Sequence, residues 1–95
     1  METDGSEADE RPEVTRRELL DYLSEAFMVN VEHIPLDRSL VDEGIIDSFG
    51  LVEIVGHLEN TYSFAVQESD MTRDNFGSVN RMVRYIDASV RRHES

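Results

Sequence analysis

Apolar side chains recur at intervals of three and four residues in three stretches, 15–30, 48–60 and 78–92, and this spacing predicts three amphipathic helices. Thr15 and Glu18 fit a capping box at the start of the first helix, just ahead of its apolar stripe. The expected core-facing residues are Leu19, Tyr22, Leu23, Ala26 and Phe27, then Leu51, Ile54, Val55 and Leu58, then Val79, Met82, Val83, Ile86 and Val90. Each set covers one helix face, so the three helices can share one core.

The chain between the first two predicted helices, residues 30–47, is expected to form a long ordered loop. Pro35 and Gly44 interrupt the helical spacing there. The apolar residues expected to anchor this loop to the core are Ile34, Leu36, Leu40 and Ile45. A connection of this length is uncommon in a compact domain and is often functional.

A short third helix or turn is expected around residues 70–75, followed by Phe76 as an apolar anchor and Ser78 as the N-cap of the last helix. No run of useful length alternates with the period of a strand. The predicted fold is therefore all-α: a four-helix bundle of three longer helices and one short third helix, with a long ordered loop between helices one and two.

Length and composition define the expected domain limits. Residues 1–12 are polar and acidic and predict a disordered tail, 13–92 form one folded domain, and 93–95 are a C-terminal tail. The chain has no cysteine, so neither a disulfide nor a thiolate zinc site can stabilise it. The acidic N-terminus does not resemble a signal peptide, and no apolar run can span a bilayer. We expect a cytoplasmic monomer.

The net charge of −12 is unevenly distributed. Residues 37–60 hold six acidic side chains against Arg38 alone, whereas residues 61–95 balance five acidic side chains with five arginines. Nucleic acid is an unsuitable partner for such a surface, because phosphate backbones require positive charge. An acidic middle segment suits a basic protein partner, although acidity can also serve solubility alone.

The outer face of the second predicted helix carries residues that a purely structural helix does not need. Phe49 and Val52 are large and apolar on the face opposite the core stripe, where Glu53 and Gly56 also lie. These four residues are the candidate partner-binding surface. Packing of Phe49 and Val52 by the preceding loop is the alternative.

The segment Asp42-Glu-Gly-Ile-Ile-Asp-Ser-Phe-Gly-Leu-Val-Glu53 resembles the phosphopantetheine attachment motif of acyl and aminoacyl carrier proteins. In that family an Asp-Ser pair followed by a large apolar residue opens the second helix of a four-helix bundle, and the family serine falls on Ser48. Gly44 and Phe49, together with Asp74-Asn-Phe76 and Val79-Asn-Arg-Met82, are more similar to D-alanyl carriers than to fatty-acid carriers.

The resemblance implies a stand-alone carrier without an active site of its own, holding acyl or aminoacyl groups as thioesters on a 4'-phosphopantetheine arm at Ser48. Asp47 is then the adjacent motif residue, and Mg²⁺ is needed only in the complex with the transferase. The implied partners are a phosphopantetheinyl transferase, an adenylating or acyltransferase loading enzyme, and downstream synthase, condensing or tailoring enzymes. No nucleic-acid or membrane partner is implied.

A second function class remains open from the residues alone. Ser48 can be an ordinary helix cap or a phosphorylation site in a non-catalytic acidic interaction module. The histidines His33, His57 and His93 are too scattered to form a metal site, and Ile46 stands where a nucleophile elbow needs glycine. We therefore predict neither a catalytic nor a metal site.

Overall fold

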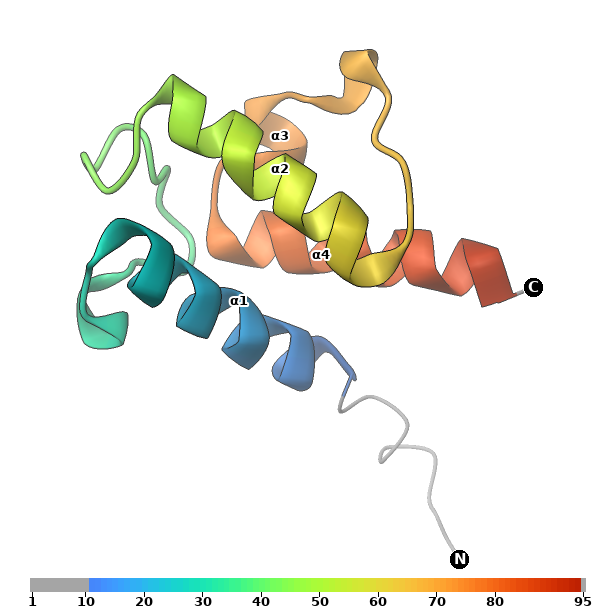
Figure 1. The fold of residues 1–95 in the computed structure, drawn as a ribbon, viewed down its shortest axis with the longest axis horizontal. Helices are drawn as coiled ribbons and strands as arrows, with labels where there is room; N and C mark the ends of the chain where they lie inside the picture. Colours follow the sequence, from blue (N-terminus) through green and yellow to red (C-terminus); the bar gives the residue numbers. More distant parts are fainter. Residues whose placement is uncertain (1–10, 95) are drawn as a thin grey trace, which may run out of the picture.

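The computed structural model describes residues 11–94, which form an all-helical bundle (Figure 1). The helices are α1 (Arg11–Phe27), α2 (Ser48–Tyr62), α3 (Arg73–Phe76) and α4 (Val79–Glu94), with 3₁₀ turns η2 (Val31–His33) and η3 (Glu68–Asp70). No strand is present in this part of the chain. The predicted architecture of three longer helices, a short third helix and a long loop is confirmed.

The start of α1 differs from the prediction. The helix already includes Arg11 and Pro12, which we expected in the tail, and proline is tolerated in a first turn because no intrahelical N–H is needed there. Thr15 lies inside the helix with only 4% of its surface exposed, so the capping box is wrong. Thr15 instead shares the buried face of Leu19 and Leu23, four and eight residues later. The rest of the expected tail, 1–10, lies outside the described residues.

The ends of α1 and α4 are also shifted. Helix α1 ends at Phe27 rather than near Asn30, because Met28 adopts a left-handed conformation (φ 57°) and the Val29 N–H donates to the Ser24 carbonyl at 3.2 Å. Helix α4 continues to Glu94, two residues beyond the expected domain limit.

The core lies around α4, which contacts each of the other three helices. The buried apolar residues are Leu19, Leu23, Ile34, Leu40, Ile46, Ile54, Val55, Leu58, Phe64, Phe76, Val79, Met82, Val83 and Ile86. Tyr22, Phe27, Leu51 and Val90 pack against this cluster and are partly buried. Two expectations fail: Ala26 is exposed, and Leu36 keeps 38% of its surface exposed although it was expected as an anchor.

The long loop is ordered by the start of α4. The Leu40 N–H donates to the Gly77 carbonyl at 2.9 Å, and the Asn80 N–H donates to the Leu36 carbonyl at the same distance. The Leu40 side chain is fully buried. In Figure 1 the loop, in green, and the start of α2 lie at the same end of the bundle. These contacts explain how the loop keeps a single conformation up to Asp47 although it contains no long helix.

Asn80 connects three separate segments through its side chain. Its Nδ2 donates to Asp37 Oδ1 at 2.7 Å, and Arg16 Nε donates to its Oδ1 at 2.9 Å. Beside it, the Ser78 hydroxyl accepts a hydrogen bond from the Arg81 N–H at 3.3 Å, which confirms Ser78 as the cap of α4.

Candidate functional site

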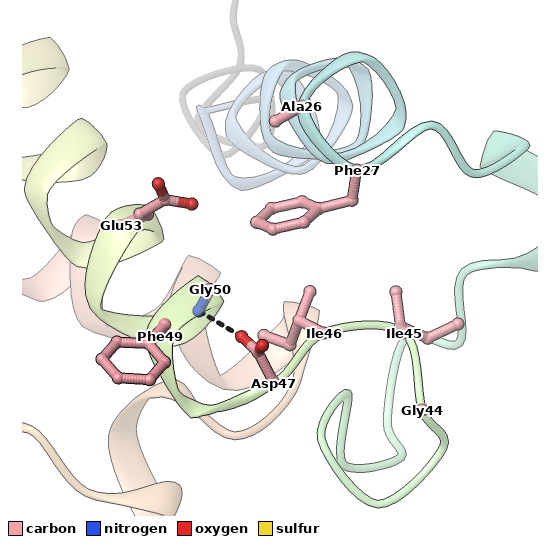
Figure 2. Close-up of a pocket in the computed structure, with 9 residues that line it drawn as sticks. All are labelled: Ala26, Phe27, Gly44, Ile45, Ile46, Asp47, Phe49, Gly50 and Glu53. Carbon is pink, nitrogen blue, oxygen red and sulfur yellow. Dashed lines mark hydrogen bonds between the residues drawn. The ribbon is translucent and has the colours of Figure 1, made fainter.

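The first turn of α2 is capped by Asp47 and not by Ser48. Asp47 has an extended backbone (φ −104°, ψ −174°), and its Oδ1 accepts a hydrogen bond from the Gly50 N–H at 2.8 Å (Figure 2). Ser48 is the first residue of the helix and is exposed. The interpretation of Ser48 as only a helix cap is therefore wrong, since its neighbour performs that role.

A tight turn directs the chain into this cap. The Gly44 N–H donates to the Val41 carbonyl at 3.1 Å, and the Ile45 N–H donates to the Leu40 carbonyl at 2.9 Å. Gly44 has a φ of +76°, a conformation that favours glycine. Ile46, next to the cap, is 7% exposed and joins the core. The turn at Gly44 and the burial of Ile46 therefore fix the segment that leads to Asp47.

The outer face of α2 is exposed as the apolar pattern predicts. Phe49 keeps 83% of its surface accessible and Val52 keeps 56%, so the loop does not pack over them. Glu53 is exposed as well, and Gly56 is half-buried with open space where a Cβ would lie. Their role in binding a partner stays a prediction, but all four are accessible on the helix that Ser48 begins.

A pocket of about 710 Å³ lies between the end of α1, the loop and the first turns of α2. Its lining consists of Ala26, Phe27, Gly44, Ile45, Ile46, Asp47, Phe49, Gly50 and Glu53. Figure 2 shows the Phe27 ring reaching from α1 into the space beside Ile46 and Gly50. A Cβ on Gly50 would lie 3.0 Å from Phe27 Cε1 and 3.1 Å from the Ile46 Cβ, so this glycine admits the ring.

The pocket is acidic. Asp47 and Glu53 contribute carboxylates to its lining, which contains no basic side chain. Nearby, the pKa of Tyr22 is raised above its ordinary value by burial and, to a smaller extent, by the negative charge of Glu53. Sequence patterns did not predict this pocket, although a glycine in the first turn of a helix is a signal of close approach.

The known protein family that matches this chain is described as the phosphopantetheine attachment site, and the match covers residues 17–86. The chain belongs to this carrier-protein family. D-alanyl carrier proteins of Streptococcus sanguinis and Streptococcus mutans are both 34% identical to it, over 68 and 71 residues. These alignments cover 72% and 75% of this chain and 85% and 89% of the relatives. No solved structure matches the chain with statistical significance.

Family membership confirms the resemblance seen in the sequence and makes the chain a phosphopantetheine carrier, with a covalently attached 4'-phosphopantetheine. Carriers of this kind interact with loading and synthase enzymes and are generally non-catalytic. The residues at the start of α2 fit the group. A phosphodiester on an exposed first-turn serine is favoured by the helix dipole, and the Asp47 carboxylate beside it is already engaged as the cap.

Other polar residues of this carrier protein have structural roles. Glu59 accepts a hydrogen bond from the Val66 N–H at 2.8 Å and so orders the chain after α2. His57 stacks on Tyr22, and His33 is exposed at η2; the His93 side chain lies outside the described part.

Among the described residues, no three His, Cys, Asp or Glu side chains are placed to hold a metal ion. Within 11–94, no helix is both long and apolar enough to cross a bilayer.

Proposed function

We propose that Ser48 carries the 4'-phosphopantetheine arm and that the protein uses it to deliver acyl or aminoacyl groups to biosynthetic enzymes. The observation that carries this proposal is the division of roles at the start of α2. Asp47 caps the helix, while Ser48 stays exposed at its first position. A residue that only stabilised the helix would occupy the cap position instead.

In the proposed modification, the Ser48 oxygen attacks the phosphorus of coenzyme A that bears the pantetheine. A new P–O bond forms, the pyrophosphate P–O bond breaks, and adenosine 3',5'-bisphosphate leaves. The proton of the hydroxyl passes to a base of the transferase. Asp47 stands beside Ser48, where its carboxylate can help bind the Mg²⁺ that coordinates the coenzyme A phosphates in that complex.

The bound arm supplies the thiol that this cysteine-free chain lacks, on which cargo is held as a thioester. We propose an amino acid or another small acyl group as the cargo, because the relatives are named D-alanyl carrier proteins. The partner that loads it is then an adenylating enzyme; an acyltransferase is the alternative. Chemistry on the cargo belongs to downstream synthase, condensing or tailoring enzymes. The proposed location is the cytoplasm.

Incubation with coenzyme A, Mg²⁺ and a broad-specificity phosphopantetheinyl transferase, followed by intact-mass measurement, tests the proposal. We expect the mass of one phosphopantetheinyl group to be added to the wild type and to Ser69→Ala, which removes another exposed serine hydroxyl. We expect no addition to Ser48→Ala. Modification of Ser48→Ala, or none in the wild type, would overturn the assignment and favour the acidic interaction module.

A further inference from the structure

The pocket between α1 and α2 lies directly beside the proposed attachment point. Ser48 is flanked in the chain by Asp47 and Phe49, and both of these neighbours line the pocket. A volume of about 710 Å³ is in the range that holds a drug-sized organic ligand. A flexible arm attached at Ser48 can therefore fold back on itself so that its loaded end reaches the pocket.

The lining offers two kinds of contact. Phe27, Ile45 and Ile46 provide apolar surface, and the Phe27 ring lies close to Gly50 on the α1 side of the pocket. Glu53 lies at the rim, with its carboxylate directed toward the space beside Phe27 (Figure 2). An occupant whose chain carries methyl and methylene groups and whose end is cationic makes both kinds of contact.

We propose that this pocket is the resting site of the loaded arm, and that Glu53 selects cargo with a free ammonium group over neutral or anionic cargo. The inference rests on the proposed function, because it needs the arm on Ser48. An aminoacyl group retains its α-ammonium when its carboxyl group is bonded to the arm. That ammonium is attracted to Glu53, and no basic side chain in the lining competes for the carboxylate.

The same charge acts against dicarboxylic cargo. A malonyl group presents a second carboxylate, which the Glu53 and Asp47 carboxylates repel. An acetyl group is neutral and gains only the apolar contacts. The expected order of occupancy in the pocket is therefore aminoacyl, then acetyl, then malonyl. An exposed ion pair changes such occupancies by up to about five-fold, the upper end of the range measured for surface pairs.

Nuclear magnetic resonance on proteins carrying defined arms tests this order. The transferase attaches glycyl, acetyl or malonyl arms from coenzyme A analogues in which an amide replaces the thioester, so that each cargo persists during measurement. Intact mass first establishes that the arm is attached. Backbone amide shifts of Phe27, Gly50 and Glu53 and contacts from the arm to the Phe27 ring then report occupancy. We expect both to be largest for the glycyl arm and weakest for the malonyl arm.

Two charge variants separate a contact in the pocket from the effect of net charge. Glu53→Gln should reduce the glycyl response toward that of the acetyl arm, a loss of up to about five-fold in occupancy, while Asp47 retains part of the preference. Glu68→Gln removes the same charge at an exposed site in η3 and should leave the response unchanged. Raising the salt concentration should weaken the glycyl preference in the wild type.

The outcomes distinguish the two proposals. Equal responses to all three arms would overturn the selection by charge, and no response despite complete attachment would overturn the pocket as a resting site. In both cases the carrier function of Ser48 stands. Failure of attachment in the mass measurement would remove the proposed function and this inference with it.

Discussion

Tyr22 and His57 stack face to face, with their ring centroids 3.6 Å apart and their planes 3° from parallel. The pair connects α1 to α2, and the Tyr62 hydroxyl connects the same helices by donating to Glu18 Oε1 at 2.7 Å. Because stacked aromatic pairs contribute beyond their buried area, replacing both rings should cost less than the sum of the single replacements.

We expect a coupling free energy of about 0.5–1.5 kcal/mol between Tyr22→Ala and His57→Ala in a double-mutant cycle. Urea unfolding of the two single variants and the double variant measures it. His33→Ala, at an exposed histidine outside the stack, should change the free energy of unfolding by less than about 0.5 kcal/mol. Additive costs for Tyr22 and His57 would show that the stack does not join the helices energetically.

The cap of α2 predicts two separable effects at Asp47. Asp47→Ala removes the acceptor of the Gly50 N–H and should lower the free energy of unfolding by about 0.5–2 kcal/mol. Asp47→Asn keeps a capping oxygen, so its free energy of unfolding should fall by less than that of Asp47→Ala. If the carboxylate also helps bind Mg²⁺ in the transferase complex, both variants should be modified slowly. Thermal melts together with modification rates check this, and a normal rate for Asp47→Asn would leave the carboxylate only the capping role.

The two faces of α2 should respond differently to truncation. Ile54 is fully buried, so Ile54→Ala should cost about 2–5 kcal/mol of stability. Val52→Ala should stay within about 0.5 kcal/mol of the wild type, because 56% of its surface is exposed, yet it should slow turnover by the transferase or loading enzyme. Melting temperatures and loading kinetics, measured for both variants, test this difference between the two faces. Equal destabilisation by the two variants would place Val52 in the core.

Tyr62 predicts a loss of stability at alkaline pH. Burial, followed by the hydrogen bond and the charge of Glu18, raises its pKa in the folded state above the ordinary value of 10.0. A group with a raised pKa contributes stability that is complete below its unfolded pKa and is lost as the pH rises toward the folded pKa. Urea unfolding from about pH 9 upward should therefore show a steeper decline for the wild type than for Tyr62→Phe. Parallel declines would indicate that other groups cause the loss.

The helices that bury a regular apolar stripe were predictable from the sequence. Which of several suitable residues caps the start of a helix was not. Ile54 and Leu58 repeat at the spacing of one helix face, and both are buried. Asp47 and Ser48 are adjacent residues with similar capping preferences, so only the backbone geometry of the structure tells which one caps. Thr15 is a good cap by type, but its spacing from Leu19 places it in the core.

Side-chain contacts between different segments could not be predicted from the sequence for another reason. Phe27 meets Gly50 because the end of α1 lies beside the first turn of α2, and no local pattern encodes that arrangement. The Glu59 carboxylate accepts a hydrogen bond from the Val66 N–H, seven residues later, because of the path that the chain takes after α2. The exposure of Phe49 was predictable, whereas the pocket that it helps to line required the tertiary arrangement.

The Asn80 side chain also bears on how the protein matures during synthesis. It joins Arg16, 64 residues earlier in the chain, and Asp37, 43 residues earlier, and contacts of such separation form late because long segments must first be closed. Ser48 leaves the ribosome well before the residues that order its approaching loop. We therefore expect a nascent chain without α4 to present this serine poorly, so that the fold itself delays attachment of the arm until α4 has left the ribosome.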